Sequence, residues 1–200
     1  MIRLAVLLSG RGSNFTAIHQ AIFARELDAQ IVAVISNRSD APGIALARAW
    51  GYNAHVIDHK KFADRAAHES AILDVLIDAN PDFIALAGYM RLLSSDFVAR
   101  FEHRIVNIHP SLLPSFRGVD AQQQAVDYGV KISGCTVHFV DENLDAGPII
   151  VQRAVAVLPA DTASTLAARI LEQEHIAYVD ALRILARGNY AIEARRVVVV

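Results

Sequence analysis

Short apolar segments that alternate with helical segments are the feature of this sequence that most limits its fold. Each apolar segment is too short for a helix and carries few polar residues, which is typical of parallel strands buried on both faces. The segments are LAVLL (4–8), IVAVIS (31–36), AHVID (54–58), DFIALAG (82–88) and IVNIH (105–109). Residues with helical spacing lie between them, at 14–25, 42–50, 64–79 and 95–100. This alternation predicts an α/β fold with a doubly wound, mostly parallel sheet and right-handed crossovers.

The pattern changes towards the C-terminus. Segments whose side chains alternate between apolar and polar favour antiparallel strands, and two segments have this pattern: 133–140 and 149–157. A long helix is predicted over 162–186, with Asp161 as its N-cap and Gly188 as its stop. The tail RRVVVV (195–200) is predicted to be a last edge strand or a loosely ordered end.

Composition argues against several classes of protein. The chain has 200 residues and a formal net charge of −2, so it lacks the excess of Lys and Arg that a broad nucleic-acid surface requires. Cys135 is the only cysteine, which excludes an intrachain disulfide and a multi-cysteine metal site. No apolar run approaches the length of a membrane span. We therefore expect a cytoplasmic protein, a monomer or homodimer, with no nucleic-acid or membrane partner.

The segment LLSGRGSNF (7–15) joins the first predicted strand to the first helix and is typical of an anion site. Gly10 and Gly12 turn the chain and let a ligand approach the backbone, while the start of a helix near Ser13 offers free N–H groups to a phosphate. The dinucleotide fingerprint G-x-G-x-x-G is excluded because Phe15 occupies the third glycine position. The alternative is an ordinary strand–helix turn, capped by the side chain of Ser13 or of the asparagine after it.

The strand IVNIH ends in a polar pair. Asn107 and His109 are two residues apart, so their side chains share one face of the strand. Ligands of open α/β sheets bind beyond the carboxyl ends of the strands, which places this pair well for contact with a small molecule. Pro110 and Pro114 make the following loop stiff, which suits a preorganised site. The alternative is that both side chains bond to nearby loop carbonyls.

An acidic turn, VDENLDAGPII (140–150), follows the next predicted strand. Acids in a loop are usually solvated, but Ala-Gly-Pro fixes the backbone directly after Asp145. A carboxylate held there could orient a histidine and stabilise its charged form. The histidines show no metal-ligand spacing, so no metal is expected. His138 is predicted to be structural.

Taken in order, four motifs resemble those of the folate-dependent phosphoribosylglycinamide formyltransferases: SGRGSN (9–14), AGYMRLLS (87–94), NIHPSLLPSFRG (107–118) and LDAGPI (144–149). The third and fourth are specific for folate-type formyltransferases as a group, and the first narrows the group to the enzymes that act on glycinamide ribonucleotide. The resemblance extends from end to end of the chain. It implies a Rossmann-like formyltransferase fold and a single domain of residues 1–200, with a phosphosugar-binding half (1–104) and a folate-binding and catalytic half (105–200).

The implied reaction transfers a formyl group from 10-formyltetrahydrofolate, as co-substrate, to the amine of 5-phosphoribosylglycinamide. The resemblance assigns catalysis to Asn107, His109 and Asp145. It assigns substrate binding to Gly12, Ser13, Asn14 and Glu174. It assigns folate binding to Arg65, Met90, Arg91, Leu92, Leu93, Asn107, Val140 and Leu144. The sequence departs from the commonest family pattern at Gln122, near which a histidine is frequent, and at Leu171, where a polar residue sometimes contacts the phosphoribosyl group.

The implied chemistry suits these residue types. An amine that attacks a formyl carbon creates a tetrahedral intermediate with a negative oxygen, which the Asn107 amide and a protonated His109 would stabilise. Histidine exchanges protons near neutral pH, since its unperturbed pKa is about 6.5. Asp145 would favour the imidazolium and assist the transfer of the amine proton, through water.

Three other functions remain open from the sequence. An NADP-type oxidoreductase would explain the first strand–Gly–helix segment, with Arg38 on a 2′-phosphate, but leaves the motifs at 107–118 and 144–149 unexplained. A non-catalytic phosphosugar or folate sensor could share the fold, although it has no need of all three catalytic residues. Formyl transfer to a different phosphorylated amine would use the same phosphate loop.

Overall fold

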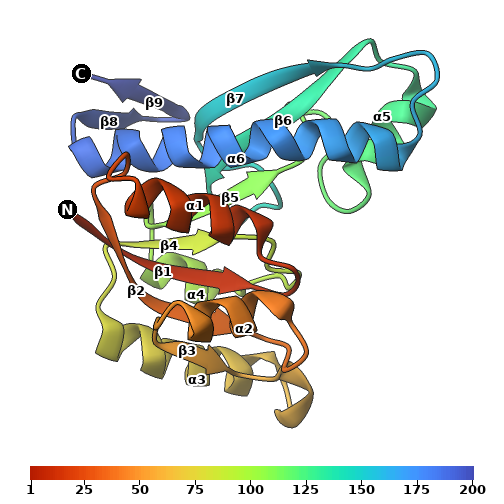
Figure 1. Cartoon of the computed structure of the whole chain (residues 1–200). Helices are drawn as coiled ribbons and strands as arrows, with labels where there is room; N and C mark the ends of the chain where they lie inside the picture. The colour runs from red at the N-terminus through yellow and green to blue at the C-terminus, as the bar shows by residue number, and fades with distance from the viewer. The chain divides into compact units, whose positions relative to one another are not determined.

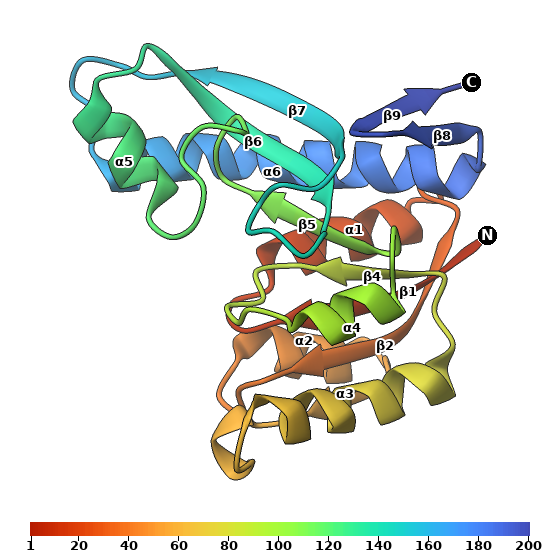
Figure 2. The same ribbon diagram turned by 180° about the vertical axis from the view of Figure 1, so that it is seen from behind.

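Residues 1–106 form an open parallel sheet with helices on both faces (Figures 1 and 2). The computed structural model describes residues 1–200, which divide into this unit and a second unit of residues 107–200. The strand order in the first unit is β3-β2-β1-β4, and paired neighbours are parallel. Its elements are β1 (Ile2–Leu8), α1 (Ser13–Phe23), β2 (Ala29–Ser36), α2 (Pro42–Ala49), β3 (Ala54–Val56), the 3₁₀ helix η1 (His59–Lys61), α3 (Arg65–Ala79), β4 (Phe83–Leu86) and α4 (Ser95–Arg100).

Strand β1 lies at the centre of this sheet, between β2 and β4. The residues from Leu4 to Leu8 are 0% exposed, as expected for a strand that helices cover on both faces. Helices α1 and α2 lie on one face, towards the viewer in Figure 1, and α3 and α4 lie on the other, towards the viewer in Figure 2. The predicted doubly wound arrangement is confirmed.

The second unit combines antiparallel strands with a long helix. Strand β5 (Ile105–His109) begins in the first unit and ends in the second. The following elements are α5 (Ala121–Tyr128), β6 (Ile132–Phe139), β7 (Ile149–Ala156), α6 (Ala163–Arg187), β8 (Tyr190–Glu193) and β9 (Arg196–Val199). β6 and β7 pair in antiparallel fashion from Ile132–Ala156 onward. Helix α6 packs along both strands (Figure 1) and ends at Gly188, whose φ is 67°.

The C-terminal tail forms a strand, but not the edge strand that the sequence suggested. β9 lies between β7 and β8: it pairs in parallel with β7 at Ile149–Arg196 and in antiparallel fashion with β8. The edge is therefore β8, a strand absent from the sequence analysis. The short segment YAIE (190–193) carries too little pattern to mark a strand, and it forms one only because β9 pairs with it.

The helices differ from the sequence analysis in one element that it missed and in one N-cap that it assigned wrongly. α5 has no counterpart in the sequence analysis, because only two of its residues, both alanines, are buried and no apolar periodicity marks it. The N-cap of α6 is Thr162, whose Oγ1 accepts the Thr165 N–H at 3.3 Å. Asp161, predicted for that position, instead pairs with Arg169 at 2.7 Å. None of the helices combines the length and the apolar composition that a membrane span requires.

Candidate functional site

The predicted phosphate loop connects β1 to α1. Gly12 is the N-cap of α1 and adopts a left-handed conformation (φ 77°), which glycine adopts at little cost. No side chain caps the helix, so the predicted alternative of a turn capped by Ser13 or Asn14 is wrong. A Cβ on Gly12 would lie 3.0 Å from the Gly43 Cα, which explains the second glycine of the motif. The start of α1 thus offers N–H groups that no capping side chain satisfies, as an anion site requires.

The hydroxyl of Ser9 links the phosphate loop to the segment that begins at Met90. The Met90 N–H donates to Ser9 Oγ at 2.8 Å, and Ser9 Oγ donates to Asn37 Oδ1 at 2.5 Å. Ser9 and Asn37 are buried, whereas Met90 is 78% exposed and Leu92 is 66% exposed. One buried hydroxyl therefore positions two loops of the first unit, and the second of these presents apolar side chains to solvent.

The predicted catalytic residues come together in the second unit. His109 Nδ1 lies 3.4 Å from Asp145 Oδ2, and the two side chains are 5% and 10% exposed. The Gly118 N–H donates to the same carboxylate oxygen at 2.8 Å. His109 Nε2 lies 2.8 Å from the Phe116 carbonyl, so the alternative of a bond to a loop carbonyl also holds at this nitrogen. Both ring nitrogens face oxygen acceptors, an arrangement that a doubly protonated imidazole satisfies fully.

His138 is the functional candidate that sequence reasoning missed. Its ring is buried (1% exposed) with Nδ1 2.8 Å from the Phe139 carbonyl and Nε2 3.3 Å from Asn107 Nδ2. Burial lowers the pKa of His138, against the opposing effect of the Phe139 carbonyl. A neutral ring donates from Nδ1 to that carbonyl, which leaves Nε2 to accept from the Asn107 amide. The prediction of a purely structural role is therefore too narrow, because His138 orients the amide of a predicted catalytic residue.

The turn that carries Asp145 has little freedom. Asp145 has a φ of 47°, a left-handed conformation that is uncommon for residues other than glycine. Two residues later, a Cβ on Gly147 would lie 1.9 Å from the Phe139 carbonyl oxygen. The Phe139 N–H donates to the Pro148 carbonyl at 2.9 Å. The close approach of Phe139 explains why glycine follows the acid, as the sequence pattern suggested.

Comparison with known proteins identifies the family. The model of the formyl transferase family matches residues 2–182. The chain belongs to the formyl transferase family. A phosphoribosylglycinamide formyltransferase of Bacillus subtilis is 40% identical over 189 residues, which cover 94% of this chain and 97% of that protein. The structure of glycinamide ribonucleotide transformylase 1 from Symbiobacterium toebii has a TM-score of 0.97 and 45% identity, and covers 100% of this chain and 94% of that chain.

Longer relatives contain a matching portion. The trifunctional purine biosynthetic protein adenosine-3 of Gallus gallus is 44% identical over 187 residues. That match covers 94% of the present formyl transferase chain but only 19% of the avian protein. The chain therefore spans about a fifth of the length of this relative.

The other predicted residues of the formyl transferase lie at the ends of elements or on helix faces. In the first unit, Arg65 is the first residue of α3 and is exposed. In the second unit, Val140 directly follows β6, Leu144 is 52% exposed, and Glu174 lies buried on α6. The two departures from the family pattern, Gln122 and Leu171, are half-buried positions on α5 and α6. The structure contains no group of three or more His, Cys, Asp or Glu side chains arranged to hold a metal ion.

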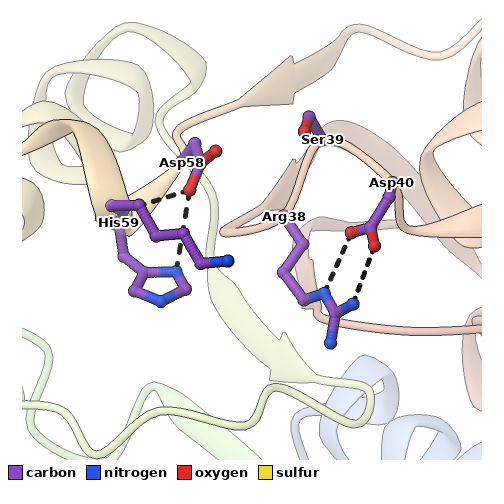
Figure 3. A pocket seen from close by; sticks show the side chains of 6 residues that line it. Arg38, Ser39, Asp40, Asp58 and His59 are labelled. Carbon is purple, nitrogen blue, oxygen red and sulfur yellow. Dashed lines mark hydrogen bonds and ion pairs between the residues drawn. The ribbon is translucent and has the colours of Figure 1, made fainter.

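An open pocket of about 460 Å³ lies elsewhere in the first unit, beyond the ends of β2 and β3 (Figure 3). None of the residues predicted for formyl transfer lines it; Arg38, named for the alternative oxidoreductase, does. Its charged side chains largely pair with each other: Arg38 donates to Asp40 at 3.0 and 2.8 Å, and Asp58 lies 3.9 Å from His59. Because the pocket is open at the surface and Arg38 is paired with Asp40, we assign the chemistry to the His109–Asp145 group and not to this pocket.

Proposed function

We propose that this formyl transferase is a phosphoribosylglycinamide formyltransferase of purine biosynthesis. It transfers a formyl group from 10-formyltetrahydrofolate to the amine of 5-phosphoribosylglycinamide. The observation that carries the proposal is the buried group in which His109 lies 3.4 Å from Asp145 and His138 holds the Asn107 amide. The near full-length similarity to the Bacillus subtilis enzyme supports the choice of substrate.

Residues of the first unit are proposed to bind the substrate phosphate and the folate. The uncapped start of α1, with Gly12, Ser13 and Asn14, would hold the substrate phosphate through backbone N–H groups. The exposed segment from Met90 to Leu93 would line the pterin pocket, and the Arg65 guanidinium would pair with a folate carboxylate. Val140 and Leu144 are proposed for folate binding, and Glu174 for contact with the ribose or amide of the acceptor.

In the chemical step, the acceptor amine attacks the formyl carbon and the carbonyl oxygen becomes an oxyanion. Asn107 Nδ2 carries two N–H bonds, of which His138 takes one and the oxyanion would take the other. A protonated His109 would supply the second donor. Its Nε2 must first leave the Phe116 carbonyl, 2.8 Å away, for the developing oxyanion.

Proton transfers complete the reaction. The attacking nitrogen must lose a proton before the intermediate collapses, and Asp145 would accept it through a water molecule while it keeps His109 oriented. Collapse breaks the bond between the formyl carbon and N10 of the folate. N10 gains a proton, which His109 would deliver, and the proton taken up by Asp145 would then return to His109, 3.4 Å away. The products are the formylated amide and tetrahydrofolate.

An absorbance assay tests this proposal. Purified protein is mixed with 10-formyltetrahydrofolate and 5-phosphoribosylglycinamide, and release of tetrahydrofolate is followed by absorbance. We expect release that requires the amine, that is lost in His109→Ala and that persists in His103→Ala, a matched change at an exposed histidine. Release without the amine would indicate a hydrolase. Folate binding without release would indicate another acceptor or a sensor, and a change in nicotinamide fluorescence on mixing would indicate an oxidoreductase.

A further inference from the structure

The C-terminal hairpin of β8 and β9 contains none of the residues to which the proposed function assigns a role. It lies outside residues 2–182, which match the family model. Its open end is closed by two hydrogen bonds: the Val200 N–H donates to the Asn189 carbonyl at 2.8 Å, and Asn189 Nδ2 donates to the Val200 carbonyl at 3.1 Å. The hairpin is therefore a defined two-stranded ribbon with its turn at residues 194–195.

The turn of this hairpin contacts the segment that carries the catalytic carboxylate. Arg195 Nη2 donates to the Ala146 carbonyl at 2.5 Å. Ala146 directly follows Asp145, so the guanidinium binds the first carbonyl group after the acid. Charge-assisted bonds from a guanidinium are among the stronger hydrogen bonds of proteins. The next residue, Gly147, packs against the Phe139 carbonyl, so the peptide between Ala146 and Gly147 is held by two different segments.

The rest of the hairpin is anchored on both sides of that segment. On the far side of the acidic turn, β9 pairs with β7 at Ile149–Arg196. On the near side, the Tyr190 ring of β8 stacks on the Phe139 ring with centroids 6.3 Å apart and planes at 29°. The contacts therefore fall at residues 139, 146 and 149, which surround Asp145 in sequence. The anchored ribbon therefore places the backbone of Arg195 beside the acidic turn, and the hydrogen bond to the Ala146 carbonyl places its guanidinium.

Asp145 needs such support because its left-handed backbone (φ 47°) is held only where the surroundings impose it. We propose that Arg195 is a positioning residue for the formyl transfer reaction: by holding the Ala146 carbonyl, it keeps the Asp145 carboxylate at its 3.4 Å distance from His109. Arg195 acts through Asp145 and touches no reacting atom. For its kinetic test, this inference rests on the proposed function.

Two neighbouring arginines give a matched comparison. Both side chains are exposed; Arg195→Gln removes the guanidinium from Ala146, whereas Arg196→Gln makes the same change in charge one residue later. We expect Arg195→Gln to lower kcat roughly 10- to 100-fold with little change in either KM, and Arg196→Gln to match the unaltered protein. Arg195→Lys, which keeps a donor, should recover part of the lost kcat. Equal effects of the two glutamine variants would overturn the proposal.

A double-mutant cycle separates positioning from general stability. In an Asp145→Asn background, the carboxylate that Arg195 positions is already gone. Arg195→Gln should then cause little further loss of the residual kcat, because residues that act as one unit are not additive. A loss as large as in the unaltered background would contradict the proposal and would assign Arg195 to stability alone.

Hydrogen exchange supplies a readout that does not depend on activity. Arg195→Gln should speed amide exchange in the peptide covering residues 141–148, while exchange in β1 and α1 stays unchanged, and Arg196→Gln should leave the 141–148 peptide as it is. If the unaltered protein lacked transferase activity but this pattern appeared, the proposed function would fail and the positioning of the turn would stand. Unchanged exchange in Arg195→Gln would overturn the positioning itself.

Discussion

The Asp145 carboxylate lies close to groups of three separate segments. Its Oδ2 accepts the Gly118 N–H at 2.8 Å and faces His109 at 3.4 Å, while its Oδ1 lies 3.8 Å from His138 Nε2. Because a neutral His138 presents a lone pair to the carboxylate, this last contact orients nothing by itself. The carboxylate is thus directed at His109, and the neighbouring histidine serves Asn107 instead.

At the residue scale, Asn107→Ala removes one of the two donors proposed for the oxyanion. Loss of such a donor typically costs about 10²–10³ in kcat, or roughly 2.7–4 kcal/mol. We expect a loss of at least this size, with both KM values nearly unchanged because the ground-state carbonyl binds the donor weakly. Steady-state kinetics on the folded variant measure the effect. A rise in KM at constant kcat would instead assign Asn107 to substrate binding.

Two substitutions at His138 distinguish orientation of the amide from core packing. His138→Leu removes the acceptor that faces Asn107 Nδ2, so we expect kcat to fall about tenfold, the equivalent of roughly 1.4 kcal/mol. His138→Gln keeps a side-chain oxygen that can accept from Asn107 Nδ2, so this variant should lose less activity than His138→Leu. Kinetics and thermal unfolding of both variants are compared. Greater activity in the leucine variant than in the glutamine variant would contradict the orienting role.

At the scale of elements, the phosphate loop depends on helix α2 as well as on α1. The Gly43 N–H donates to the Gly10 carbonyl at 3.0 Å, and a Cβ on Gly43 would lie 3.0 Å from Leu8 Cδ2 and 3.1 Å from the Gly10 oxygen. The second helix of the unit therefore packs directly under the turn. This contact fixes the position of the phosphate loop relative to the end of β1.

Gly43→Ala should push the phosphate loop out of place. We expect the KM for phosphoribosylglycinamide to rise roughly tenfold, with a smaller effect on the KM for the folate and on kcat. Initial rates at varied concentrations of each substrate provide the measurement. A variant that loses affinity for both substrates equally would point to general loosening of the unit.

The elements also show what could be predicted from sequence. Buried strands such as β1 and β4 are continuous apolar runs, so their existence and approximate bounds follow from hydropathy. The proximity of Asn107 and His109 follows from their shared face of β5. α5 and β8 could not be predicted, because they bury few apolar side chains: α5 buries two alanines, and β8 forms only through its pairing with β9. The same is true of His138, whose bond to Asn107 depends on the conformation that places β6 opposite β5's polar pair.

At the scale of the whole molecule, buried and half-buried histidines make stability depend on pH. Burial lowers the pKa of four of them: His19, His68, His138 and His175. In the unfolded chain they titrate near pH 6.5. As pH falls through that value, the unfolded state takes up protons that the folded state does not, so the free energy of unfolding falls.

Urea unfolding at pH 7.5, 6.5 and about 5.0 tests this dependence. We expect stability to decline between pH 7 and 5, before carboxylates titrate. Asp161, whose pKa the Arg169 hydrogen bond holds well below its usual range, contributes to the loss of stability only at lower pH. His68→Gln should reduce the slope between pH 7 and 5. A flat profile over that range would show that these histidines protonate without unfolding cost.

The hydrogen bond between His109 Nε2 and the Phe116 carbonyl has a consequence for hydrolysis of the formyl donor. While His109 Nε2 donates to the Phe116 carbonyl, it cannot donate the proton that N10 of the formyl donor must gain when water attacks the formyl carbon. Hydrolysis of the formyl donor by the protein without its amine substrate would then be slow. His109 would become available as a general acid only when a substrate displaces the Phe116 carbonyl from Nε2. One peptide carbonyl would thus protect the formyl donor from hydrolysis until the amine substrate is bound.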